Sequence, residues 1–184
     1  AVHEGVPYIM SRAGAFAALS DLRDEGVVRA IGSACYDPAL NADYIETGEF
    51  DVAICSASWS LVNHRLRERL IPIARETGTA LLIAEPLERG LLAVGVEPGR
   101  TYADRRFAPE VLQNVRQIER LCAEHGYRLL DVGLHWMVRE AVVAASIPGA
   151  ATPEEAIANA AVGDVDISDA FWEELSHITP GFSH

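Results

Sequence analysis

The sequence predicts an α/β fold built on a parallel sheet. The first support is four short apolar segments, at residues 27–33, 52–56, 80–84 and 142–146, which have the length and composition of buried strands. Amphipathic stretches separate these segments, and strands that alternate with helices are typical of parallel sheets. Residues 80–84 are apolar throughout, as strands covered on both faces tend to be. This pattern by itself does not distinguish a barrel from an open sheet.

The first expected helix covers residues 13–25, where apolar side chains recur at helical spacing and Gly26 supplies a C-terminal stop. The strand at 27–33 follows it. Asp37 and Pro38 then form an N-cap and first-turn pair, which predicts a short helix to about residue 47.

After the strand at 52–56, the apolar spacing predicts a helix over residues 65–76 that ends at Gly78. The strand at 80–84 leads into a long loop over residues 85–108, which is rich in Gly, Pro and Arg. We expect helices at 65–76 and 109–126 to flank this strand and loop.

The last part of the chain repeats the alternation. A helix over residues 129–139 precedes the strand at 142–146, and Thr152 with Glu155 forms a capping box that opens a helix to about residue 162. A final amphipathic helix carries Phe171, Trp172, Leu175 and Ile178. Residues 1–3 fit the end of a further strand, and we expect one incomplete domain over residues 1–184.

Composition excludes several functions. The chain has 184 residues, is 49% hydrophobic and carries a net charge of −12, which argues against nucleic-acid binding. No apolar stretch is long enough to cross a membrane. All 15 basic residues are Arg, so this chain offers no catalytic lysine. Three cysteines without CxxC spacing and no secretory segment at the start predict a reduced, cytoplasmic setting. No pattern indicates a metal site.

Four groups of residues, at 22–33, 83–92, 134–150 and 152–159, resemble segments of the aldo-keto reductase family in the same order. They are similar to the approach to the family's fifth barrel strand, its seventh strand and cofactor loop, its late helix and eighth strand, and the helix that cradles adenine. The aldose dehydrogenase branch, which includes galactose and fucose dehydrogenases, is the most similar. The resemblance implies a (β/α)8 fold of the TIM-barrel type. Only about the C-terminal half to five-eighths of that barrel is present.

The same resemblance implies a function for the complete protein. It would be an NAD(P)-dependent oxidoreductase that transfers hydride between a nicotinamide and the carbonyl or lactol carbon of a sugar or aldehyde. His3 matches the family's substrate-facing histidine. The Asp, Tyr and Lys that accompany this histidine lie upstream in the family, on segments that this chain does not contain. We therefore expect the chain alone to be inactive, and its N-terminal Ala suggests a processed chain or a piece of a longer one.

The cofactor side of the family pattern is better represented. By resemblance, Ser33 lies near the nicotinamide carboxamide and Trp59 lines the site. The segment from Leu87 to Gly90 offers backbone amides to the pyrophosphate. The adenosine end would contact Gly149, Ala151, Thr152, Glu155 and Asn159. Family members that prefer NADP carry a basic residue after the eighth strand, and this chain has none there, so we expect NAD rather than NADP.

Each of these residues also has a purely structural interpretation. His3 could be a frayed terminal residue, Trp59 a packing residue, and the two loops ordinary turns with a helix cap. His64 with Arg65, Arg67 and Arg69 suggests a charged helix face, and His135 a packed side chain. Asp164, Asp166 and Asp169 lack the rest of a calcium-binding pattern.

Two other functions stay open at this point. The chain could be a non-catalytic half-barrel that pairs with itself or with a complementary N-terminal half, because two open strand edges need cover. It could also be an unrelated α/β protein that binds a nucleotide, although no GxGxxG follows a predicted strand.

Overall fold

The computed structural model describes residues 5–103 and 105–179. Its main sheet has four parallel strands in the order β1 (Gly32–Cys35), β2 (Val52–Ser56), β5 (Ala80–Ala84) and β6 (Val143–Ile147). The spatial order follows the chain without reversal, as in consecutive units of a barrel, whereas a doubly wound sheet reverses its strand order. A separate antiparallel pair, β3 (Trp59–Ser60) with β4 (Asn63–His64), follows the carboxyl end of β2.

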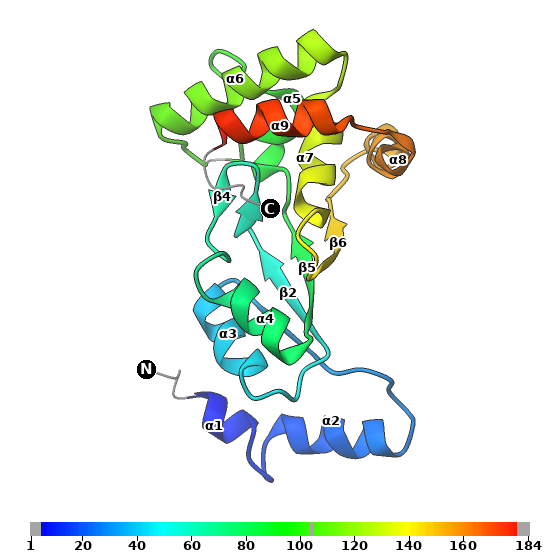
Figure 1. Cartoon of the computed structure of the whole chain (residues 1–184). Helices are drawn as coiled ribbons and strands as arrows, with labels where there is room; N and C mark the ends of the chain where they lie inside the picture. Colours follow the sequence, from blue (N-terminus) through cyan, green and yellow to red (C-terminus); the bar gives the residue numbers. More distant parts are fainter. Residues whose placement is uncertain (1–4, 104, 180–184) are drawn as a thin grey trace.

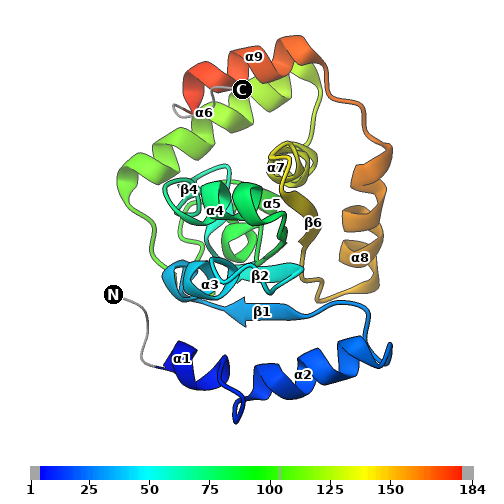
Figure 2. The same cartoon turned by 60° about the horizontal axis from the view of Figure 1, so that its bottom comes forward.

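Helices lie around this sheet and at both ends of the molecule (Figure 1). Helices α1 (Gly5–Ile9) and α2 (Ala15–Asp24) form one end, and α6 (Pro109–His125) with α9 (Asp169–Ile178) forms the other, as Figure 2 also shows. The remaining helices of eight or more residues are α3 (Pro38–Ile45), α4 (Leu70–Thr77), α7 (Leu129–Val138) and α8 (Pro153–Ala160).

Helix ends follow the signals in the sequence. The Asp37 side chain accepts a hydrogen bond from Ala39 N at 2.9 Å and caps α3, whose first residue is Pro38. Gly78 and Gly126 adopt left-handed conformations, with φ of 73° and 76°, directly after α4 and α6. Glycine reaches this region without a Cβ clash, so both helices end where the sequence predicts.

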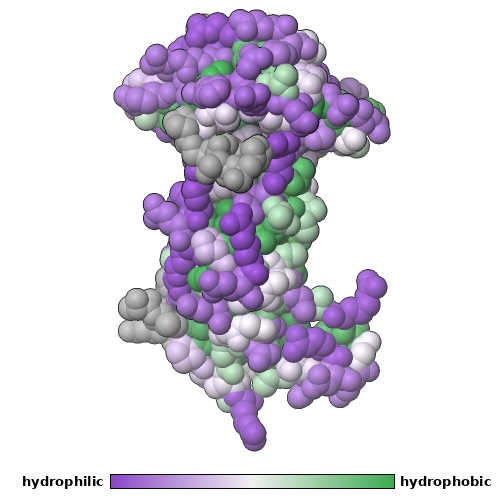
Figure 3. All heavy atoms as spheres, viewed as in Figure 1, coloured by the Kyte–Doolittle hydropathy of each residue, from purple (hydrophilic) through white to green (hydrophobic). Residues whose placement is uncertain are grey.

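The two faces of the sheet differ in burial. On one face, Ala53, Cys55, Leu81 and Ile83 are at most 1% exposed and belong to the core that the helices cover. On the other face, neighbouring strands align Ile54 with Leu82, and both side chains are only half-buried. Ile147 at the end of β6 is 44% exposed. Apolar surface is visible at the narrow middle of the molecule (Figure 3). A closed barrel would enclose this second face.

Two expected elements are corrected by the structure. The strand predicted at 27–33 is β1, at Gly32–Cys35, because Val27 is 67% exposed and pairs with none of the described strands. The helix predicted at 65–76 begins only at Leu70. Residues 65–69 form turns after the β3–β4 pair, although Leu66 is fully buried there. His64 is therefore a strand residue, and no charged helix face forms over residues 64–69.

Smaller differences concern the connecting segments. The last strand, predicted at 142–146, is displaced by one residue, and the segment at 5–12 contains α1. The loop predicted at 85–108 contains the 3-10 helix η1 (Glu88–Gly90) and α5 (Leu91–Val94). A second 3-10 helix, η2 (Ala161–Asp164), follows α8. The strand expected at residues 1–3 lies outside the described residues.

Candidate functional site

A cavity of about 590 Å³ lies at the carboxyl ends of β5 and β6. One wall is the segment from Glu85 to Val94, which follows β5, and the opposite wall is the segment from Gly149 to Asn159, which follows β6. Leu130 of α7 and Arg100 complete the lining. Loops at the carboxyl ends of parallel strands are where α/β barrels carry their sites.

Most of the residues that the sequence predicted for cofactor binding meet in this one cavity. They are Leu87, Gly90, Gly149, Ala151, Glu155 and Asn159. The residues that follow β5 and those that follow β6 are about 60 residues apart in the chain. They come together because β5 and β6 are adjacent and parallel, so that both strands deliver their following loops to one edge.

The α8 wall is fixed by its own hydrogen bonds. Thr152 caps the helix by accepting from Glu155 N at 3.2 Å, and the Glu155 carboxylate accepts from Ala151 N at 2.7 Å. Asn159 Nδ2 donates to Gly149 O at 3.3 Å. The predicted cap at Thr152 is confirmed. The second hydrogen bond of the capping box, which the Glu155 carboxylate makes, is accepted from Ala151 N, the residue before the cap. This wall is therefore held in place before any ligand arrives.

The β5 wall carries opposite charges at its edge. Glu85 forms an ion pair with Arg89 at 2.9 Å and accepts a hydrogen bond from the Tyr36 hydroxyl at 2.8 Å. This hydrogen bond raises the pKa of Tyr36, since a bond to the carboxylate stabilises the neutral phenol. Tyr36 directly follows β1, so the contact spans the carboxyl end of β2.

The backbone of this wall is strained at Glu88 and Arg89. Their φ values are 49° and 57°, a region that non-glycine residues rarely adopt, and Gly90 follows at 97°. Buried contacts at Glu88 hold the conformation. Its carboxylate is 1% exposed, accepts a hydrogen bond from Ser60 Oγ at 2.7 Å and pairs with Arg105 at 2.5 Å. Strain of this kind persists only where surrounding contacts fix it, and it is frequent at functional sites.

Three of the predicted residues do not line the cavity. Ser33 is buried against α3, where its hydroxyl donates to Asn41 Oδ1 at 2.9 Å. Trp59 is 3% exposed, and its ring centroid lies 5.0 Å from that of Trp136. Thr152 serves as the α8 cap. His3 lies outside the described residues.

The Trp59 cluster also contains His64, whose ring stacks on Trp136 with centroids 5.2 Å apart. Burial, together with the positive charge of Arg67, lowers the pKa of His64 to about 4. A backbone hydrogen bond with Leu61 acts in the opposite direction, because it favours the charged ring. His64 is therefore neutral near pH 7. Burial also raises the pKa of the thiols of Cys55 and Cys122 to about 12, so neither is a reactive thiolate.

Sequence reasoning assigned the backbone of residues 87–90 to the site but missed several charged side chains of the cavity. Arg89 and Arg100 bring positive charge to the lining, and Glu85 brings negative charge. The only signal for the two arginines was the abundance of Arg in the loop at 85–108, which does not identify individual residues. His135, predicted to be packed, is half-buried, and its Nε2 lies 2.8 Å from Val162 O.

Within the described ranges, no group of three or more His, Cys, Asp or Glu residues is placed to hold a metal ion. No helix among the described residues has the length and apolar character needed to span a membrane.

Comparison with known proteins decides the family. The model of the aldo/keto reductase family matches residues 5–179 of this chain. The chain belongs to the aldo/keto reductase family. The resemblance seen in the sequence is thereby confirmed.

Sequence relatives of this aldo/keto reductase chain are oxidoreductases by name. It is 28% identical over 173 residues to the NADH-specific methylglyoxal reductase of Escherichia coli, covering 89% of this chain and 52% of that protein. It is 27% identical over 169 residues to the pyridoxal 4-dehydrogenase of Microbacterium luteolum, covering 90% and 48%. The D-threo-aldose 1-dehydrogenase of a Pseudomonas species is 25% identical over 91% of this chain and 51% of that protein. This chain spans about half the length of these relatives.

Solved structures show the same fold. A holo-form aldo-keto reductase of Bacillus halodurans superposes with a TM-score of 0.72 at 20% identity, over 92% of this chain and 56% of that one. The glycerol dehydrogenase of Gluconobacter oxydans gives a TM-score of 0.74 at 18% identity, over 96% and 55%. The predicted fold class, an α/β parallel sheet that makes up part of a TIM barrel, is confirmed.

Proposed function

We propose that the complete protein is an NAD-dependent oxidoreductase and that this chain supplies its nucleotide-binding half. The observation that carries the proposal is the cavity between the loops after β5 and β6, where residues matched to the family's cofactor pattern meet. The E. coli relative bears the name NADH-specific, which agrees with a nicotinamide cofactor. When bound, the nicotinamide would supply hydride chemistry that no side chain can perform.

The residues of the cavity fit a dinucleotide. Its volume of about 590 Å³ is in the range of small-molecule sites. Arg89 and Arg100 offer positive charge to a diphosphate, and the backbone from Leu87 to Gly90 offers amide donors. Asn159 offers an amide side chain at the α8 wall, where we place the adenosine end.

Charge at the α8 wall favours NAD over NADP. Ala151 carries no charge, and Glu154 and Glu155 follow it in the first turn of α8. A 2′-phosphate placed here would meet two carboxylates and no basic side chain of this wall, so electrostatic repulsion would weaken NADP binding.

The substrate that we propose is an aldehyde or a sugar, oxidised or reduced at a carbonyl or lactol carbon. As hydride moves, charge develops on the substrate oxygen, and a positioned acid must supply or remove a proton. We assign the orientation of this oxygen to His3 and expect the proton-transferring groups on the other half of the barrel. The 184-residue chain alone should therefore bind NADH without catalysing turnover.

A titration with NADH, followed by the fluorescence of the three tryptophans, tests the proposal. Ala158 lines the cavity, and Ala158→Phe would fill part of it and weaken binding by about tenfold or more. The control is Ala156→Phe, an exposed position of the same helix outside the lining, which should bind NADH as the wild type does. Failure of the wild-type chain to bind NADH, or unchanged binding by Ala158→Phe, would overturn the proposal.

The half-open sheet favours a second candidate function. Ile54, Leu82 and Ile147 expose apolar surface on the face that a barrel would enclose, and β1 and β6 are the edges of the described sheet. Such a face could pair two copies of the chain as an assembly module. Sedimentation equilibrium decides the matter, because a mass of one chain at micromolar concentration contradicts the module.

A further inference from the structure

A second cavity, of about 530 Å³, lies within the segment that connects α5 to α6. Its lining includes Arg100, Arg105 and Arg106 together with the rings of Tyr102 and Phe107. Among the described residues, no Asp or Glu lines it. In a chain of net charge −12, a cavity lined by three arginines is a distinct electrostatic environment.

The loop that forms this cavity has a defined structure. Tyr102 is 5% exposed, and its hydroxyl donates to Gly95 O at 2.7 Å while accepting from Glu97 N at 3.1 Å. Its ring packs edge to face against Phe107, with centroids 5.7 Å apart. These contacts fix the course of the loop, so the arginines project from a formed surface.

Two of the arginines are held by carboxylates behind the cavity. Arg105 pairs with the buried Glu88 at 2.5 Å and lies over the Phe107 ring at 5.0 Å. Arg100 pairs with Glu97 at 2.6 Å. A guanidinium carries five N–H donors, so one ion pair orients the group and leaves donors for a second acceptor. The third arginine, Arg106, is exposed.

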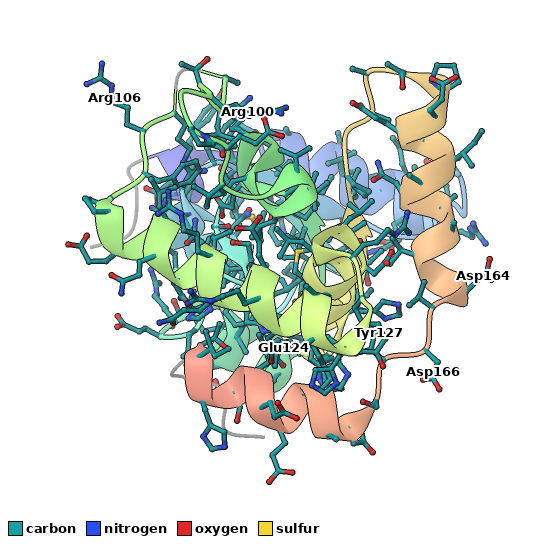
Figure 4. All side chains as sticks on the ribbon, turned by 90° about the horizontal axis from the view of Figure 1, so that it is seen from above. Arg100, Arg106, Glu124, Tyr127, Asp164 and Asp166 are labelled. Carbon is teal, nitrogen blue, oxygen red and sulfur yellow. The ribbon has the colours of Figure 1, made fainter. Side chains whose placement is uncertain are left out.

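The position of the cavity relates it to the candidate nucleotide site. Arg100 lines both cavities, so the two are neighbours. Glu88, which anchors Arg105, belongs to the segment that follows β5, on the carboxyl side of the sheet where barrel enzymes bind their ligands. Figure 4 shows Arg100 and Arg106 at the same side of the molecule, with Arg106 extending outward at the rim.

We propose that this arginine cavity binds the oxyanion group of a small molecule, a phosphate or a carboxylate. Planar guanidinium groups recognise such groups through paired N–H donors, and three of them line this one cavity. The site is separate from the nucleotide cavity except at Arg100 and does not depend on the proposed oxidoreductase function. A ligand bound here would lie beside a bound nucleotide.

Isothermal titration calorimetry with inorganic phosphate and with acetate, on the 184-residue chain at constant ionic strength, tests the inference. Glycerol serves as the uncharged probe. Arg106→Gln removes a charge that belongs to this cavity alone, and Arg29→Gln removes the same charge from an exposed position before β1, at the opposite end of the sheet. Arg89→Gln reports on the nucleotide cavity.

We expect saturable binding of phosphate or acetate, weakened about fivefold to tenfold by Arg106→Gln and less than about twofold by Arg29→Gln and Arg89→Gln. The probe that binds more tightly identifies phosphate or carboxylate as the preferred group. Absence of saturable binding by both anions overturns the inference. So does binding that Arg89→Gln weakens and Arg106→Gln leaves unchanged, because the anion would then occupy the nucleotide cavity. Unchanged thermal unfolding of Arg106→Gln verifies that the variant is folded.

Discussion

The guanidinium of Arg105 lies 2.5 Å from the carboxylate of Glu88, a side chain that is only 1% exposed. This ion pair joins the loop before α6 to the strained turn after β5. It therefore connects the wall of the candidate nucleotide cavity to the arginine cavity, and it makes Glu88 a positioning residue for both.

Replacing Glu88 by Gln tests this connection. The variant keeps an acceptor for Ser60 but leaves Arg105 without its counter-charge, so we expect a loss of about 2 kcal/mol in the free energy of unfolding, measured with urea. Because the strained turn loses a support, NADH binding should also weaken, by about threefold or more.

Asp43 provides a matched control. Its side chain is 1% exposed and pairs with Arg69 at 2.6 Å, away from the cavity. Asp43→Asn should lower stability by a similar amount and leave NADH affinity unchanged. Equal losses of affinity in the two variants would show that Glu88 acts only through general stability.

His64 should make the protein less stable in mild acid. Its pKa is about 4 in the fold and about 6.5 in the unfolded chain, so the unfolded state binds the proton more readily. The stability that the neutral His64 ring contributes to the fold is therefore complete above pH 6.5 and is lost as the pH falls toward 4. The loss in unfolding free energy amounts to about 1 to 2 kcal/mol, after allowance for a ring that is only half-buried. Urea unfolding at pH 7.0, 5.5 and 4.5 measures it.

The His64→Phe variant keeps a ring beside Trp136 and cannot be protonated. The difference in stability between wild type and variant should change in favour of the variant as the pH falls. A difference that is constant from pH 7.0 to 4.5 contradicts the lowered pKa.

The core depends on the covered face of β5. Leu81 is fully buried at the centre of the sheet, and Leu81→Ala should cost about 2 to 4 kcal/mol in unfolding free energy, since a cavity remains where the side chain was. Ile157→Ala removes an aliphatic side chain that is 69% exposed and should cost less than about 0.5 kcal/mol. Comparable losses in the two variants would mean that this face of β5 is not the core.

Cofactor preference should respond to charge at the α8 wall. Ala151→Arg places a guanidinium where we expect the adenosine end, so NADPH affinity should rise about tenfold relative to NADH affinity. Val27→Arg adds the same charge at an exposed position on the loop before β1 and serves as the control. An unchanged ratio in Ala151→Arg would place the adenosine end elsewhere.

The sequence predicted the strands at 52–56 and 80–84 and the caps at Asp37 and Thr152 because these signals are local. It misplaced β1 because Val27 and Val28 have strand propensity but no partner among the described strands, and pairing decides which residues form a ladder. It began α4 five residues early because the apolar Leu66 fits a helical period, whereas the structure buries Leu66 within turns that follow the β3–β4 pair.

Part of the candidate site was predicted because its signals are also local in the sequence. The loops after β5 and β6 carry recognisable patterns, and parallel pairing brings them together. Ser33 and Trp59 were assigned to the site by resemblance, yet their side chains have buried contacts with Asn41 and Trp136. Strand direction alone cannot reveal which face of a strand a side chain occupies.

By itself, the sequence determined the alternation of strands and helices, the helix caps, the absence of lysine and the family pattern. Only the tertiary structure decided the unreversed order β1-β2-β5-β6, the half-open sheet face and the grouping of Arg100, Arg105 and Arg106 around one cavity. Local signals act over a few residues and can be read along the chain. Strand order, burial and the convergence of charges depend on contacts between segments far apart in sequence, which exist only once the chain has folded.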